Sequence, residues 1–144
     1  MTAPALLDVN VLIALLDRSH VDHRTARQWL TGHADPSWAS CAITQNGYVR
    51  VVSQPSYPAS VSTSAALALL AAACGTLHHE FWPCDVSLLD AHVVDRGLVL
   101  GPKQLTDVYL LALAVRHNGR LVTFDRSIPV AAVAGANPRH LVVL

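Results

Sequence analysis

An apolar run interrupted by one carboxylate and one amide lies near the start of the chain, Ala5-Leu6-Leu7-Asp8-Val9-Asn10-Val11-Leu12-Ile13-Ala14-Leu15-Leu16. The run is too apolar for a surface strand and too short to span a membrane. Leu6-Leu7-Asp8 is typical of the end of a buried strand, and residues 11–16 continue as a helix with Asn10 near its start. The run therefore predicts a strand that passes into a helix, with an acid at the junction.

Strand and helix patterns alternate along the rest of the chain. Further strands are expected over residues 36–41, 77–82, 120–125 and 140–144. Further helices are expected over residues 21–30, 44–52, 60–74, 87–96 and 106–115, the last capped by Thr106. This alternation predicts an α/β fold with a mainly parallel central sheet, in a single domain over residues 1–144.

The chain is rich in apolar side chains and carries no net charge. Hydrophobic residues make up 52% of the 144 residues and charged residues 14%, with a formal net charge of +0. Either a partner covers apolar surface, or the composition reflects a bias toward Ala and Val codons, which the single lysine also suggests. A global basic field for an architectural nucleic-acid binder is excluded, whereas a nucleic-acid enzyme with a local basic rim is not.

Cysteine and histidine usage argues against several kinds of site. Three cysteines without a Cys-x-x-Cys spacing indicate free thiols in a reducing compartment, so we expect a cytoplasmic location. The eight histidines lack finger-type cysteine partners, so structural zinc is not supported. A Gly-rich phosphate loop, a hydrolase triad, a secretory signal and a membrane span are not expected either.

Three aspartates fall where a parallel sheet gathers its functional groups. Asp8 follows the first strand, Asp125 ends the strand over 120–125, and Asp107 lies in the first turn of the helix over 106–115. Sites in such sheets form beyond the carboxyl ends of the strands. Carboxylates held together require a cation, and Mg²⁺ or Mn²⁺ prefers oxygen ligands. Such a site activates water and binds a phosphodiester.

Each aspartate taken alone has a simpler explanation. Asp8 and Asp107 can serve as helix-terminal groups, and Asp125 can be a loop acid. A phosphoacceptor receiver domain also gathers acids at strand ends. That class pairs two acids early in the chain and places a lysine after the last strand, and neither feature is present here.

Four motifs, in order and over nearly the whole chain, resemble those of PIN-domain ribonucleases and most closely the VapC toxins of bacterial VapBC pairs. They are residues 6–15, Thr44-Gln45-Asn46-Gly47-Tyr48-Val49-Arg50-Val51, residues 105–114 and Arg120-Leu121-Val122-Thr123-Phe124-Asp125. The resemblance implies a three-layer α/β/α PIN-like fold with four to five strands. It also implies a Mg²⁺-dependent endoribonuclease toxin with an RNA substrate, a VapB-type antitoxin, a homodimer and no membrane association.

By position, Asp8, Asp107 and Asp125 match the metal-binding acids of the family, and Asn10 matches a residue that orients the first acid. Gln45 stands where many members carry Glu, so the expected cluster lacks one charge. Glu80, the only glutamate, lies in another strand and is not assumed to replace it.

The candidate catalytic residues are therefore Asp8, Asp107, Asp125 and Gln45. Supporting roles are assigned to Asn10, Thr106 and Arg50. Further candidates for a basic rim or an extra acid are Lys103, Arg116, Arg126, Asp85 and Asp90. An alternative is a catalytically weak PIN-like module that binds RNA or protein, because Gln45 leaves the cluster a charge short.

Overall fold

A computed structural model describes residues 4–33 and 35–144 of the chain. Its sheet contains five parallel strands in the order β3-β2-β1-β4-β5. The strands are β1 (Ala5–Leu7), β2 (Trp38–Cys41), β3 (His79–Trp82), β4 (Arg120–Thr123) and β5 (Leu141–Val143). The predicted α/β class with a parallel sheet is confirmed.

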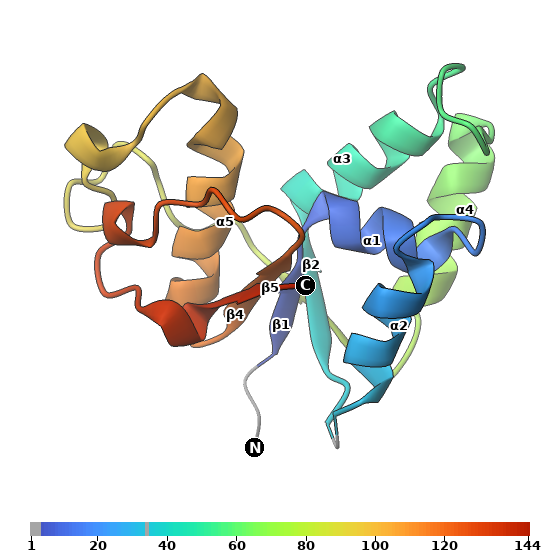
Figure 1. Cartoon of the computed structure of the whole chain (residues 1–144), viewed down its shortest axis with the longest axis horizontal. Helices are drawn as coiled ribbons and strands as arrows, with labels where there is room; N and C mark the ends of the chain where they lie inside the picture. The colour runs from blue at the N-terminus through green and yellow to red at the C-terminus, as the bar shows by residue number, and fades with distance from the viewer. Residues whose placement is uncertain (1–3, 34) are drawn as a thin grey trace.

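Five α-helices cover the two faces of the sheet, giving three layers. They are α1 (Val9–Leu16), α2 (His23–Thr31), α3 (Ala42–Val52), α4 (Thr63–Cys74) and α5 (Leu105–Arg116). Figure 1 shows α5 on one side of the sheet and α1 to α4 on the other. Short 3₁₀ turns occupy the connections at Arg96–Leu98, Pro102–Gln104, Val130–Ala132 and Pro138–His140.

The central strand β1 explains why the opening run is apolar on both faces. All three of its residues are fully buried. Because side chains alternate along a strand, Leu6 packs in the core beneath α5, while Ala5 and Leu7 pack in the core beneath α1 to α4. A parallel strand covered on both faces has no need for an outward polar residue.

The expected helix over residues 87–96 is wrong, because local hydrogen bonds take its place. Ser87 and Asp90 side chains accept the backbone N–H groups of the residues two positions on, which favours turns over a helix. The Val93 carbonyl accepts the N–H of Ala134, and Val94 forms an antiparallel bridge with Val133. Tertiary pairing therefore uses backbone groups that a helix would have needed.

Most expected elements begin one to three residues from the predicted start, and three of these shifts change the role of a residue. Thr106 does not cap α5, since the 3₁₀ turn before it runs directly into a helix that begins at Leu105. Val21 lies outside α2 and is 90% exposed, so the helix expected from residue 21 begins later than predicted. Strand β3 begins at His79, which leaves His78 in the preceding turn.

Gly119 occupies a position where the chain passes close to two other segments. A Cβ placed there would lie 2.5 Å from the carbonyl oxygen of Pro4 and 2.6 Å from the Trp82 ring. Gly119 immediately precedes β4, so any shift would disturb the pairing of β4 with β1. A side chain at this position would therefore displace the backbone of Pro4 or the indole of Trp82.

We predict that Gly119→Ala lowers the free energy of unfolding by about 1–3 kcal/mol, the usual cost of overpacking. Gly101→Ala is the matched control, because Gly101 has an extended backbone and nothing lies within 4 Å of its added Cβ. Urea unfolding followed by circular dichroism measures both variants. Equal midpoints for the two would contradict the close approach at Gly119.

Candidate active site

Asp8 lies at the junction of β1 and α1 and serves two purposes at once. Its Oδ1 accepts the backbone N–H of Val9 at 2.7 Å, so Asp8 is the N-cap of α1. Its Oδ2 accepts the hydroxyl hydrogen of Thr123 at 2.7 Å. The carboxylate is 6% exposed. The capping role weighed for Asp8 is therefore present, and it coexists with a place among the other acids.

Asp125 and Asp107 lie close enough to Asp8 for their charges to interact. Asp125 follows β4, and its Oδ1 accepts both the N–H and the hydroxyl of Ser127, at 2.8 and 2.7 Å. Asp107 lies in the first turn of α5. The structure thus brings together three carboxylates that are far apart in the sequence.

The pKa values of the three acids show that they interact. Burial, then the charge of Asp8, then the hydrogen bond and charge of Asp125 raise the pKa of Asp107 to about 7. Burial also raises the pKa of Asp8, against the lowering effect of its hydrogen bonds from Thr123 and Val9. The two bonds from Ser127 hold the pKa of Asp125 below its ordinary value. The surroundings of the cluster therefore do not stabilise a full negative charge on all three carboxylates near neutral pH.

Thr123, the last residue of β4, links two of these acids and was not singled out from the sequence. Its hydroxyl donates to Asp8 Oδ2 and accepts the backbone N–H of Asp125 at 3.0 Å. It is fully buried. The available signal was a hydroxyl residue in a buried apolar strand, two positions before a strand-end acid.

Asn10, expected to orient Asp8, contacts the β4 end instead. Its amide nitrogen lies 3.5 Å from Thr123 Oγ1, and its carbonyl oxygen accepts the N–H of Phe124 at 3.4 Å. Both contacts are long for hydrogen bonds. Within the described residues Asn10 reaches Asp8 through Thr123, and its role in orienting Asp8 stays a prediction.

Gln45 was expected beside the acids, but its hydrogen bond goes elsewhere. Its Nε2 donates to the hydroxyl of Ser40 at 3.0 Å. Gln45 and Arg50 both line a cavity between α3 and α4. Thr106 is exposed in the first turn of α5. The catalytic role of Gln45 and the supporting roles of Arg50 and Thr106 stay predictions.

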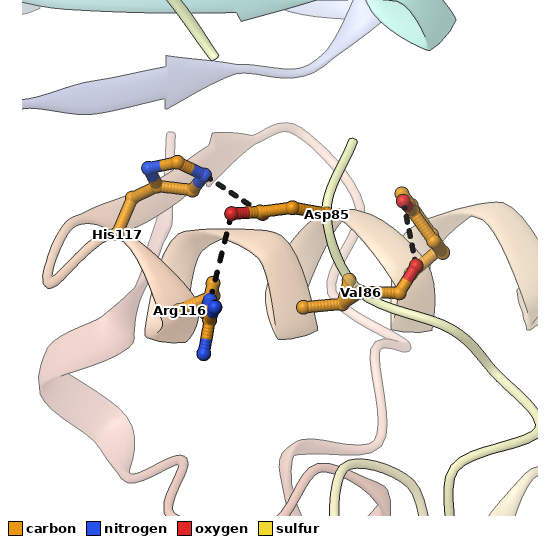
Figure 2. Close-up of polar contacts among 5 residues, drawn as sticks. Asp85, Val86, Arg116 and His117 are labelled. Atoms are coloured by element: carbon orange, nitrogen blue, oxygen red, sulfur yellow. Dashed lines mark hydrogen bonds and ion pairs between the residues drawn. The ribbon is translucent and has the colours of Figure 1, made fainter. Parts of the chain in front are cut away.

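Two further acids considered for the cluster lie outside it. Asp85 pairs with Arg116 at 3.5 Å and His117 at 3.1 Å, as Figure 2 shows. Asp90 closes a turn by accepting the N–H of His92. Arg116 stands nine residues along α5 from Asp107, about 13.5 Å at 1.5 Å per residue, and its side chain pairs with Asp85, which agrees with the solvated surface position also considered for it.

The acid cluster fits a hard divalent cation in the type of its donors. All three side chains offer carboxylate oxygens, which Mg²⁺ and Mn²⁺ prefer. Among residues 4–33 and 35–144, however, no three His, Cys, Asp or Glu side chains already lie at coordinating positions. Burial and then the charge of Asp8 raise the pKa of Asp107, and a bound cation would offset both effects by stabilising the carboxylate.

We predict that Thr123→Val lowers the free energy of unfolding by about 1–3 kcal/mol, because Asp8 Oδ2 and the Asp125 N–H lose a buried partner. Mn²⁺ affinity, measured by calorimetry, should fall as well. Thr25→Val, at an exposed position of α2, is the isosteric control. A Thr123→Val protein with unchanged stability and Mn²⁺ affinity would show that the hydroxyl does not hold the acids.

A second prediction concerns pH in the metal-free protein. Unfolded Asp107 loses its proton near its ordinary pKa of 3.8, while folded Asp107 keeps it up to about 7. Its contribution to stability is therefore complete below pH 4 and is lost as the pH rises toward 7. In EDTA, Asp107→Asn should melt higher than wild type at pH 8 by about 2–5 °C, with a smaller gain at pH 5.

Thermal melts of both proteins across this range measure the effect, and Asp90→Asn controls for removing a charge outside the cluster. An equal gain at pH 5 and pH 8 would contradict the assignment to Asp107.

Comparison with known proteins identifies the family. A family model described as the PIN domain matches residues 5–134. Ribonuclease VapC44 of Mycobacterium tuberculosis is 62% identical over 97% of this chain and 99% of its own, and Ribonuclease VapC39 of the same organism is 47% identical over 91% and 95%.

Among solved structures, Mycobacterium tuberculosis VapC20, titled a Sarcin-Ricin loop cleaving toxin, aligns with a TM-score of 0.62 over 93% of this chain and 99% of its own, at 14% identity. A toxin–antitoxin complex from Klebsiella pneumoniae aligns with a TM-score of 0.53 over 96% of each chain, at 21% identity. These two likenesses concern the fold. Together with the sequence matches, they show that the chain belongs to the PIN-domain family and, within it, to the ribonuclease VapC group.

Proposed function

We propose that this chain is a metal-dependent endoribonuclease that hydrolyses RNA phosphodiester bonds as the toxin of a type II toxin–antitoxin pair. The convergence of Asp8, Asp107 and Asp125 at the carboxyl edge of the sheet supports this proposal most directly. The membership of the ribonuclease VapC group supports the reaction type. The RNA that VapC20 cleaves is a property of that protein and names no target for this one.

Asp8, Asp107 and Asp125 are the residues that would hold Mg²⁺ or Mn²⁺. When bound, such an ion supplies activation of water and stabilisation of the charge that develops on the phosphodiester. Thr123 holds Asp8 by donating to Oδ2, and Ser127 holds Asp125 by donating to Oδ1. Asp107 would have to lose a proton to hold the cation, because its carboxyl group, with a pKa of about 7, is about half protonated near pH 7.

We propose that three exposed basic side chains, at this edge and along α3, hold RNA phosphates. Lys103 is exposed in the turn before α5, and Arg126 is exposed directly after Asp125. Arg50 is exposed on α3. With a net charge of +0, local cations of this kind supply the attraction for a polyanion that the whole chain lacks.

We also propose a VapB-type antitoxin and a second copy of the chain as protein partners. Several large apolar side chains are exposed, among them Leu77, Val21 and Leu89 at 90% or more. Such surface is commonly covered by a partner. No helix within the described residues is long and apolar enough to cross a membrane.

A catalytically weak module that binds RNA or protein is the second candidate. Gln45 brings no charge to the cluster, and its amide bonds Ser40. Gln45→Glu separates the two functions. A large gain in cleavage rate would favour a site impaired by Gln45, whereas an unchanged or lower rate would favour an enzyme already suited to it.

We predict that purified protein cleaves total bacterial RNA into discrete products with Mg²⁺ or Mn²⁺ and not with EDTA. Asp8→Ala and Asp107→Asn should each slow cleavage by roughly a hundredfold or more, since several kcal/mol of charge stabilisation depends on the ion they hold. Asp90→Asn, an exposed acid outside the cluster, should cleave at the wild-type rate. Cleavage that survives both cluster variants would remove the assigned site.

A further inference from the structure

A groove between α3 and α4 has one polar wall and one apolar wall. Its volume is about 680 Å³, which suits a small organic ligand. Leu67, Leu70 and Ala71 of α4 line the apolar wall, while Gln45 and Arg50 of α3 stand on the polar wall. None of the lining residues is acidic.

The groove begins near the acid cluster. Helix α3 starts directly after β2, at the carboxyl edge of the sheet where Asp8 also lies. Gln45 and Asn46 stand in the first turns of α3, and Arg50 stands one turn further along. A strand of RNA whose phosphodiester lies at the acids can therefore place a neighbouring nucleotide over this groove.

The orientation of the Gln45 amide follows from a chain of hydrogen bonds behind it. The backbone of Cys74 acts as a hydrogen-bond acceptor toward His79, since it counters the lowering of the ring pKa by burial, and we infer that the ring nitrogen facing Cys74 carries the hydrogen. Burial lowers the pKa of His79, which keeps the ring neutral near pH 7. The other nitrogen, Nε2, must then accept the hydroxyl hydrogen of Ser40, 2.7 Å away.

Ser40 is fully buried and has given its only hydrogen to His79. Its oxygen can therefore only accept, from Gln45 Nε2 at 3.0 Å and from the more distant thiol of Cys74 at 3.9 Å. Gln45 Oε1 is the atom left over, and within the described residues it accepts no hydrogen bond. Since Gln45 lines the groove and its amide nitrogen is held by Ser40, we infer that its carbonyl oxygen is the atom offered to the groove.

We propose that this groove binds one unpaired RNA base that carries an exocyclic amino group, next to the phosphodiester cleaved at the acid cluster. Gln45 Oε1 accepts from the amino group, the apolar wall of α4 contacts the base, and Arg50 pairs with its phosphate. The inference rests on the proposed function, because the occupant is part of the RNA substrate.

Charge and hydrogen bonding favour RNA over a protein occupant. An apolar helix seated in the groove would leave Gln45 Oε1 and the Arg50 guanidinium without partners, which costs free energy. The only ionised side chain of the lining is cationic, so the groove suits a ligand with a negative charge. A base with its phosphate satisfies the apolar wall and both polar groups.

The test compares bases that differ only in the amino group. Single-stranded RNA octamers of uridine carry one central cytidine, or the same nucleoside without its amino group. A second pair carries adenosine or purine riboside. Anisotropy with wild-type protein in EDTA measures binding without cleavage. Each amino-bearing octamer should bind about threefold to tenfold more tightly than its partner, the value of one net hydrogen bond.

Variants separate the groove from the rest of the surface. Gln45→Leu should abolish the preference, and Gln28→Leu on the exposed face of α2 should keep it. Ser40→Ala should weaken the preference without removing RNA binding, because the Gln45 amide is then free to turn. Ala71→Trp fills the groove and should weaken the binding of every octamer.

Equal affinities within both pairs for wild type would overturn the proposal. So would an Ala71→Trp protein that binds RNA normally but changes its self-association in sedimentation, since the groove would then be a protein interface. Either result leaves the proposed function standing if total RNA is still cleaved in a metal-dependent way. Absence of cleavage with intact base preference would instead overturn the function alone.

Discussion

The hydrogen bond from Thr123 to Asp8 joins the ends of β1 and β4 and holds a carboxylate at the edge of an apolar sheet. Asp8 cannot turn away, because its second oxygen caps α1. Thr123 in turn receives the N–H of Asp125, so one hydroxyl group sets the position of two acids. The rest of the site depends on this link, since Asp107 meets both acids only after β1 and β4 are paired.

The apolar layers around this link give it its chemical consequence. With β1 fully buried and α5 packed over one face, Asp8 is buried and Asp107 is half-buried, and burial is the largest cause of their raised pKa values. A carboxylate in such surroundings is costly unless a partner neutralises it. The same burial that stabilises the fold therefore creates a demand for a cation.

Local patterns predicted the parts of this structure that depend on neighbouring residues. The apolar strands, the acids that follow them and the long helices α4 and α5 could all be read from short windows. The segment 87–96 could not, because its backbone pairs with Val133 and Ala134 far along the chain. Thr123 was overlooked for a related reason, since its partners Asp8 and Asp125 meet it only in the folded sheet.

Gln45 shows most clearly what a pattern of residue types leaves out. As a residue type, it is an acid replaced by an amide, and the inference is a missing charge. In the fold, its amide nitrogen is held by Ser40, whose hydroxyl is directed by His79.

A carboxylate at position 45 could not donate to Ser40. It would have to accept the Ser40 hydroxyl hydrogen in place of His79, or turn away. The amide therefore differs from the acid in direction as well as in charge, because it presents one oxygen along a line set by buried neighbours. Under the proposed base recognition, the site has one charge fewer at the acids and in exchange a carbonyl oxygen that can accept from a donor on a base, as an enzyme that selects its RNA would need.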